Sequence, residues 1–222
     1  MRAQARPRLP QLDARLSKVL SLVPGCSLAA DIGADHGRLS LHLLRQGICE
    51  RMIVSDISAA SLQKARKLLA FHGFDDRADF VVADGFEAVT QPVQAVIVTG
   101  LGGESICRML KKAGRLGEAR LLLSPQTQTA LLRGALGESG YRIEAEHLVT
   151  AAGRWYTILQ AVPGQQALSD RERYLGYALK GSADAKVSDY LTWRLDVLSA
   201  ARDADPQHKQ WLEEAIRHET GE

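Results

Sequence analysis

Five short apolar runs of strand length recur along the first 124 residues. They occupy residues 27–31, 51–56, 78–84, 95–99 and 120–124 and are rich in Val, Ile and Leu, with little alternation between apolar and polar positions. Strands that read as continuous apolar runs are typical of a parallel sheet whose two faces are covered by helices. The pattern therefore predicts an α/β fold with at least five parallel strands.

Helical segments lie between these runs, as the crossover connections of a parallel sheet require. We predict helices at 39–47, 58–73, 104–113 and 127–139, and one more at 9–23 ahead of the first strand. In the segment 58–73, Ser58 suits a helix N-cap, Gly73 suits the end of the helix, and Leu62 and Leu69 share one face. Strands and helices thus alternate as far as residue 139.

The pattern changes after Gly140. Two strand-like runs, 141–150 and 154–162, are joined by Ala-Ala-Gly, which predicts an antiparallel hairpin. A nicotinamide-binding domain usually continues with parallel strands, whereas the class I fold of methyltransferases that depend on S-adenosylmethionine (SAM) ends in such a hairpin. We therefore predict a Rossmann-like, seven-stranded sheet with a terminal antiparallel hairpin.

A linker at 163–169 leads into a part of the chain that reads as purely helical. Helices are predicted at 170–180, 186–203 and 207–218. We expect residues 1–164 to form the sheet domain and residues 165–222 a small helical domain. A length of 222 residues suits this division.

Composition and charge narrow the function classes. The net charge is only +2, which argues against a histone-like binder, although residues 1–20 carry five basic side chains against Asp13. We call residues 1–20 the basic leader. Its basic side chains either contact phosphates or belong to the solvated start of a helix. No apolar run reaches the length of a membrane span, and the N-terminus has no apolar signal core. The three cysteines show no metal-ligand spacing, so we expect a reduced, cytoplasmic protein without a metal.

The candidate chemistry lies where the predicted strands end, because ligands of open α/β sheets bind beyond the carboxyl ends of the strands. After the first strand, Asp31-Ile-Gly33-Ala-Asp35-His36-Gly37 is a tight glycine loop with an acid inside it. That acid would repel a pyrophosphate but suits a cationic ligand, and SAM carries a sulfonium and an ammonium. We expect Gly33 to lie close to the ligand and Asp31 or Asp35 to face its methionine end.

Two further acids follow the next two strands. Asp56 stands where an acid can accept hydrogen bonds from both ribose hydroxyls, and we include its neighbour Ile57 in the cofactor site. Asp84, followed by Gly85, can accept from the exocyclic amine of the SAM adenine. Either acid could instead cap a helix. The order of all three acids at successive strand ends favours the SAM site.

The last two strand ends have less specific motifs. Thr99-Gly100-Leu101-Gly102-Gly103 demands either close backbone approach to a ligand or a very tight turn, and we place Gly100 and Gly102 in the cofactor site. The segment lacks the Asn/Asp-Pro-Pro-Tyr/Phe motif that is usual when an exocyclic amine of a base is methylated. After the fifth strand, Pro125 could hold Gln126 toward the pocket, or the segment could be a plain loop.

The chain also resembles a known family. The run ADIGADHGRLSLHLL at 30–44 is similar to the A-D-I-G-S-D-H-A-Y-L-P signature of the TrmK family, the bacterial tRNA (adenine-22-N-1)-methyltransferases. Further similarities follow in order along most of residues 13–205. They are RLSKV at 15–19, DG at 84–85, VTGLGG at 98–103, LLLSPQ at 121–126, LLRGAL at 131–136, GRWYTIL at 153–159 and YLGYALKG at 174–181. The sequence departs from the family pattern at Ala34, Gly37, Asp56, Leu101, Ser124 and Gln126.

The resemblance implies methyl transfer from SAM to N-1 of an adenine in tRNA, and a C-terminal domain that is coiled-coil-like. Within that mechanism we expect Asp35 to accept from the exocyclic amine of the target adenine and to stabilise its developing positive charge, with His36 and Gln126 holding the base. A methyltransferase that acts on another RNA site, a protein or a small molecule, and a non-catalytic SAM- or RNA-binding protein, remain alternatives.

The resemblance also implies that tRNA is gripped outside the pocket. Candidate phosphate contacts are the basic residues of the leader and of the helical tail: Arg2, Arg6, Arg8, Arg15, Lys18, Arg171, Arg173, Lys180, Lys186 and Arg194. Asp184, Asp189 and Asp196 would then have to face away from the RNA, or the tail would be an interaction helix pair.

Overall fold

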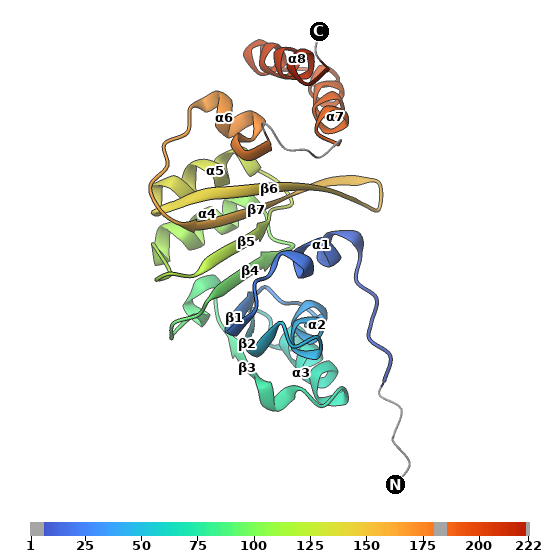
Figure 1. Ribbon diagram of the computed structural model, residues 1–222, viewed down its shortest axis with the longest axis vertical. Helices are drawn as coiled ribbons and strands as arrows, with labels where there is room; N and C mark the ends of the chain where they lie inside the picture. Colours follow the sequence, from blue (N-terminus) through green and yellow to red (C-terminus); the bar gives the residue numbers. More distant parts are fainter. Residues whose placement is uncertain (1–6, 180–185, 221–222) are drawn as a thin grey trace.

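A single mixed sheet forms the centre of the molecule in the computed structural model, which describes residues 7–179 and 186–220 (Figure 1). Its strand order is β3-β2-β1-β4-β5-β7-β6. The parallel strands are β1 (Cys26–Ile32), β2 (Cys49–Asp56), β3 (Ala78–Val82), β4 (Ala95–Thr99) and β5 (Arg120–Ser124), and the antiparallel hairpin consists of β6 (Tyr141–Ala151) and β7 (Arg154–Pro163). The predicted seven-stranded sheet with a terminal hairpin is confirmed.

Helices cover both faces of the sheet, as the apolar strands predict. In the described part of the chain, one face carries α1 (Ala14–Leu22), α2 (Arg38–Arg45) and α3 (Ala59–Phe71), and the other carries α4 (Gly103–Ala113) and α5 (Thr129–Glu138) (Figure 1). Each layer has its own apolar core: Val19, Leu43 and Leu69 belong to the first, and Ile106 and Leu132 to the second. The strands are therefore buried from both sides.

Some element boundaries differ from the predicted ones for local reasons. The first helix begins at Ala14 instead of near residue 9, because the carboxylate of Asp13 accepts from the Leu16 N–H at 2.7 Å and caps the helix there. Strand β3 ends at Val82, two residues early, and the 3₁₀ helix η2 (Gly85–Ala88) follows. Another 3₁₀ turn, η1 (Asp75–Arg77), precedes β3.

The tail is helical, but its first helix is shorter than predicted. A capping box between Ser169 and Glu172 starts α6 (Asp170–Leu175), which ends at Gly176, where φ is +112°. The 3₁₀ turn η3 (Tyr177–Leu179) follows, and α7 (Val187–Ser199) and α8 (Pro206–Thr220) pack against each other (Figure 1). Each is about two heptads long, so the coiled-coil-like arrangement stays a prediction.

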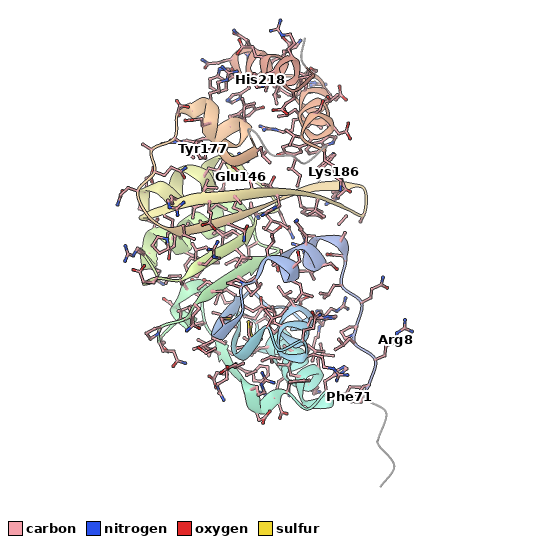
Figure 2. All side chains as sticks on the ribbon, viewed as in Figure 1. Arg8, Phe71, Glu146, Tyr177, Lys186 and His218 are labelled. Atoms are coloured by element: carbon pink, nitrogen blue, oxygen red, sulfur yellow. The ribbon has the colours of Figure 1, made fainter. Side chains whose placement is uncertain are left out.

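The tail packs on the outer strand of the sheet. Leu148 of β6 shares a buried apolar cluster with Leu179, Val187, Tyr190, Leu191 and Leu212 of the tail. Beside this cluster, the guanidinium of Arg133 on α5 pairs with the carboxylate of Glu146 at 2.7 Å, both side chains being almost completely buried. Arg133 also donates to the carbonyl oxygen of Arg173 in α6 at 2.6 Å, so one side chain joins α5, β6 and the tail. Figure 2 shows Glu146 on the strand below the tail helices.

Within the described residues, no helix combines the length and the apolar character that a membrane crossing would need.

Candidate functional site

A cavity of about 1,210 Å³ opens at the carboxyl ends of β1, β2 and β4. Strand β1 lies between β2 and β4, so the helix that follows β1 covers one face of the sheet and the helix that follows β4 covers the other. This is the topological switch point of the sheet, where open α/β folds bind their ligands. A cavity therefore lies at the strand ends where the sequence predicted a ligand site.

The cavity gathers nearly all of the candidate residues. Its lining includes Asp31, Gly33, Asp35, His36, Asp56, Ile57, Asp84, Gly85, Gly100 and Gln126. Gly102 does not line it and lies at the start of α4. The structure thus brings together residues that lie up to 95 positions apart in the chain.

Asp31 is the most deeply buried of these acids, with 1% of its surface exposed. Its carboxylate accepts from the Ser40 hydroxyl at 2.6 Å, which ties the end of β1 to the first turn of α2. Burial raises the pKa of Asp31 to about 6, opposed by the hydrogen bonds from the side chain and backbone of Ser40 and assisted by the negative charge of Asp56. A bound cation would favour the ionised form of this carboxyl.

The loop after β1 is held in a strained conformation by Asp56. Gly33 and Asp35 both have positive φ, +70° and +50°, and a non-glycine residue in that region is uncommon. One carboxylate oxygen of Asp56 accepts from the Asp35 N–H at 3.1 Å, and the other accepts from the Ser58 N–H at 2.8 Å. Ser58, and not Asp56, is the N-cap of α3. The Asp56 carboxylate is therefore fixed at the cavity wall, with lone pairs left to accept further hydrogen bonds.

Asp35 and His36 form a pair at the cavity mouth. Nδ1 of His36 lies 2.5 Å from a carboxylate oxygen of Asp35, and the side chains are 42% and 67% exposed, His36 first. Because both side chains stay accessible, the pair can meet a ligand that enters from solvent. The contact with His36 also orients the Asp35 carboxylate. The sequence did not predict this contact.

The adenine end of the predicted site combines one acid with close backbone packing. Asp84 lines the cavity just before η2 and makes no side-chain cap hydrogen bond to that turn. At Gly85 φ is +61°, and a Cβ there would lie 2.6 Å from Cγ of Met109. Ile57 is 72% exposed and offers an apolar surface in the same cavity. A flat apolar group with an amine donor fits this combination.

The glycines after β4 have two different roles. Gly100 lines the cavity with φ at +90°, and a Cβ there would lie 3.8 Å from Nε2 of Gln126. Gln126 is held beside it because its N–H donates to the Leu101 carbonyl at 2.9 Å. At Gly103, by contrast, a Cβ would lie 2.5 Å from the carbonyl oxygen of Thr127. The second half of this motif therefore serves chain packing, which is the turn alternative that the sequence left open.

Sequence reasoning missed the helical part of the lining. The missed residues that line the cavity are Ser105, Arg108, Met109 and Lys112 of α4 and Arg38 of α2. Arg15 of α1, which the sequence analysis names as a candidate phosphate contact, lines the cavity as well. The spacing of Ser105, Arg108 and Lys112 along one helical face is a signal that could have identified the α4 residues. Among the described residues, no group of three or more His, Cys, Asp or Glu side chains is arranged to hold a metal ion.

Comparison with known proteins identifies relatives of this chain. A family model described as "Methyltransferase domain" matches residues 12–159. A Bacillus subtilis protein described as tRNA (adenine(22)-N(1))-methyltransferase is 26% identical over 160 residues, which cover 70% of this chain and 67% of the relative. A Mycoplasma pneumoniae protein described as "Putative tRNA methyltransferase" is 31% identical over 164 residues, covering 71% of this chain and 75% of the relative.

A solved structure is similar over nearly the whole length of the chain. It comes from Streptococcus pneumoniae and is described as "a putative tRNA (m1A22) methyltransferase, in complex with S-adenosyl-L-methionine". It is 27% identical, the match covers 93% of this chain and 100% of the other, and the TM-score is 0.86. The match thus extends past the sheet into the helical tail.

Proposed function

This chain belongs to the methyltransferase domain family and resembles the TrmK family along most of its length, and we propose that it transfers the methyl group of SAM to N-1 of adenine 22 in tRNA. The observation that carries the proposal is the match of nearly the whole chain, tail included, to a structure in complex with SAM that is described as "a putative tRNA (m1A22) methyltransferase". The acid-lined cavity at the switch point supplies independent chemical support.

SAM is the cofactor, and the residues of the cavity fit it. When bound, it supplies an electrophilic methyl group on a sulfonium. Of the two acids that the sequence offered for its cationic methionine end, we assign the buried Asp31, and we assign Asp56 to the ribose hydroxyls and Asp84 to the adenine amine. Gly33 and Gly85 let the chain turn with positive φ at the cavity wall, and the missing Cβ of Gly85 leaves room for the Met109 side chain.

The reaction needs positioning more than strong base catalysis. The ring nitrogen N-1 of adenine already carries a lone pair, so the enzyme has to present it in line with the methyl group and stabilise the positive charge that develops on the ring. N-1 is hidden in a Watson–Crick pair, so the base must be exposed or flipped out. The accessible Asp35 carboxylate is our candidate for accepting from the exocyclic amine and stabilising that charge, and His36 and Gln126 are candidates for holding the base.

The tail arginines are poorer candidates for tRNA contacts than the leader arginines, because their guanidinium groups already have partners within the protein. In the tail, Arg171 pairs with Glu214 at 2.9 Å, and the Arg194 guanidinium stacks on the ring of Tyr174. In the leader, Arg8 is exposed, as Figure 2 shows, and Arg15 lines the cavity. The candidates Arg2, Arg6 and Lys180, and also Asp184, lie outside the described residues. We therefore propose that the leader and the cavity mouth make the main phosphate contacts.

The division into a SAM-binding domain at 1–164 and a helical domain at 165–222 stays our proposal. The buried Arg133 donates to α6, so deleting the tail would remove its acceptor there and uncover Leu148. Substitutions of exposed tail residues therefore test a tRNA role better than a deletion does. Since tRNA is the proposed substrate, we expect the protein to act in the cytoplasm.

The test is methylation of unmodified tRNA transcripts by the full chain, followed by mass spectrometry of the nucleosides. We expect 1-methyladenosine from a transcript with adenine at position 22 and none from the same transcript with guanine there. A methyl group on another nucleoside or on protein would support the alternative methyltransferase classes. Absence of SAM binding in calorimetry would support the non-catalytic alternative.

The role of Asp35 has its own test. Asp35→Asn should lower kcat at least tenfold and leave SAM affinity within about twofold, because the amide cannot stabilise positive charge on the ring. Asp75→Asn is the matched control, since Asp75 is exposed in η1 and does not line the cavity. Full turnover by Asp35→Asn would contradict the role assigned to Asp35.

A further inference from the structure

Three arginines line the cavity. Arg15 belongs to α1, Arg38 to α2 and Arg108 to α4, and these helices lie on both faces of the sheet (Figure 1). Lys112 also lines the cavity, but it forms an ion pair with Glu87. Within residues 7–179 and 186–220, none of the three arginines forms an ion pair with a carboxylate.

Their contacts leave donors available. The Arg15 guanidinium lies 5.2 Å from the centre of the Tyr156 ring, and its Nη1 is buried without a hydrogen-bond partner among the described residues. Arg108 donates from Nη2 to the hydroxyl of Ser105 at 3.2 Å, and its side chain is exposed. Each guanidinium has five N–H donors. Those on the buried Nη1 of Arg15 are closed to solvent, so the donors that can bind an anion are the remaining ones of Arg15 and those of Arg38 and Arg108.

Arg38 lies where a cation does not help the fold. It is the first residue of α2, a helix with no acid in its first turn and no side-chain cap at Gly37. A positive charge at a helix N-terminus is disfavoured, because the exposed N–H groups already make that end positive. The guanidinium of Arg38 and the positive N-terminal end of α2 together favour an anion at this part of the cavity.

The chemistry of the reaction indicates which anion this is. SAM has one carboxylate, so it can offset only one of the three positive charges that these arginines bring to the cavity. The methylated adenine is cationic, so a guanidinium beside the reacting ring would oppose the reaction. The acids Asp31, Asp56 and Asp84 lie at the strand ends, whereas the arginines come from the surrounding helices. The arginines are therefore placed for the phosphates of the RNA and not for the base.

We propose that Arg15, Arg38 and Arg108 bind the phosphodiesters on either side of the target adenine and so hold the RNA backbone at the cavity mouth. This inference rests on the proposed function and deepens it, because it names the groups that recognise the substrate as a polynucleotide. The guanidinium fork matches the geometry of phosphate oxygens, and such contacts position the RNA without reading its sequence.

The test compares Arg38→Gln, Arg108→Gln and the double variant with wild type. The measurements are tRNA Kd across a series of KCl concentrations and SAM Kd by calorimetry. Arg45→Gln is the matched control, since Arg45 is the last residue of the same helix α2 and does not line the cavity. We expect each cavity variant to weaken tRNA binding about threefold to tenfold and the salt slope to fall by about 0.7–0.9 for each phosphate that is no longer neutralised. Arg45→Gln should stay within about twofold, and SAM Kd should not change.

Two outcomes would overturn the inference while leaving the proposed function intact. A salt slope in the double variant equal to that of Arg45→Gln would show that these arginines bind no phosphate. Weakened SAM binding with unchanged tRNA Kd would assign the arginines to the SAM carboxylate. Failure of the proposed function looks different, because wild type itself would then form no 1-methyladenosine on the transcript with adenine at position 22, a result that does not depend on the arginine variants.

Discussion

Replacing Asp31 with asparagine should stabilise the fold at neutral pH and weaken SAM binding. Asp31 is buried, and its carboxylate accepts from the Ser40 hydroxyl at 2.6 Å. Asparagine keeps an acceptor for that hydroxyl but carries no charge that has to be desolvated. The two effects have opposite signs, because the charge that costs stability is the charge proposed to face the cationic end of SAM.

The magnitude follows from the pKa of this carboxyl. Burial raises the pKa of Asp31 from 3.8 to about 6, which at about 1.4 kcal/mol for each pH unit corresponds to about 3 kcal/mol. The folded chain binds this proton more tightly than the unfolded chain does. Stability therefore falls as the pH rises from about 4 to about 6, and above that the contribution is constant. Asparagine cannot ionise, so its advantage should grow across that window to about 1–3 kcal/mol at pH 8.

The assay is urea denaturation of wild type and Asp31→Asn at pH 4.5 and pH 8, with SAM calorimetry at pH 8. We expect a variant close to wild type at pH 4.5, more stable at pH 8, and at least tenfold weaker in SAM affinity. Asp75→Asn serves as the control for a general effect of removing a negative charge, since Asp75 is exposed. Equal stability differences at both pH values would contradict this account, and so would a variant less stable than wild type at pH 8.

Two further predictions concern the packing that supports the site. Arg133→Met should destabilise the fold by about 3–5 kcal/mol in urea denaturation, because the Glu146 carboxylate would stay buried without its guanidinium. The double variant with Glu146→Leu should recover most of this loss, and a double variant no better than the single one would speak against the explanation. Gly103→Ala should cost about 1–3 kcal/mol, because the new Cβ would lie 2.5 Å from the Thr127 carbonyl oxygen. Gly25→Ala, whose nearest heavy atom would be 4.0 Å away, is the control and should change stability by less than about 0.5 kcal/mol.

Local patterns were enough to predict the strands and the acids that follow them. The runs at 95–99 and 120–124 match β4 and β5 residue for residue, because a strand buried on both faces has a continuous apolar signature. The ends of the helices were predicted less accurately than the strands, because a capping side chain or a glycine determines where a helix begins or ends. Asp13 delays the start of α1, and Gly176 ends α6 early.

The edge of the sheet at which the acids lie follows from the sequence. Parallel strands all end at one edge, so Asp31, Asp56 and Asp84 had to lie along that edge once the strands were recognised, and the lateral order β3-β2-β1 makes them neighbours. The terminal hairpin follows in the same way, since the turn and the two flanking runs are adjacent in the chain.

How those acids are held, and what surrounds them, depends on the three-dimensional packing. The burial of Asp31 against Ser40, and with it the raised pKa, requires α2 to pack on the sheet as it does. The convergence of Arg38 and Arg108 requires the lateral order β2-β1-β4, which places α2 and α4 on opposite faces of the same edge. Strand order and helix packing arise from contacts between distant parts of the chain, so the local pattern of apolar and polar residues cannot predict them.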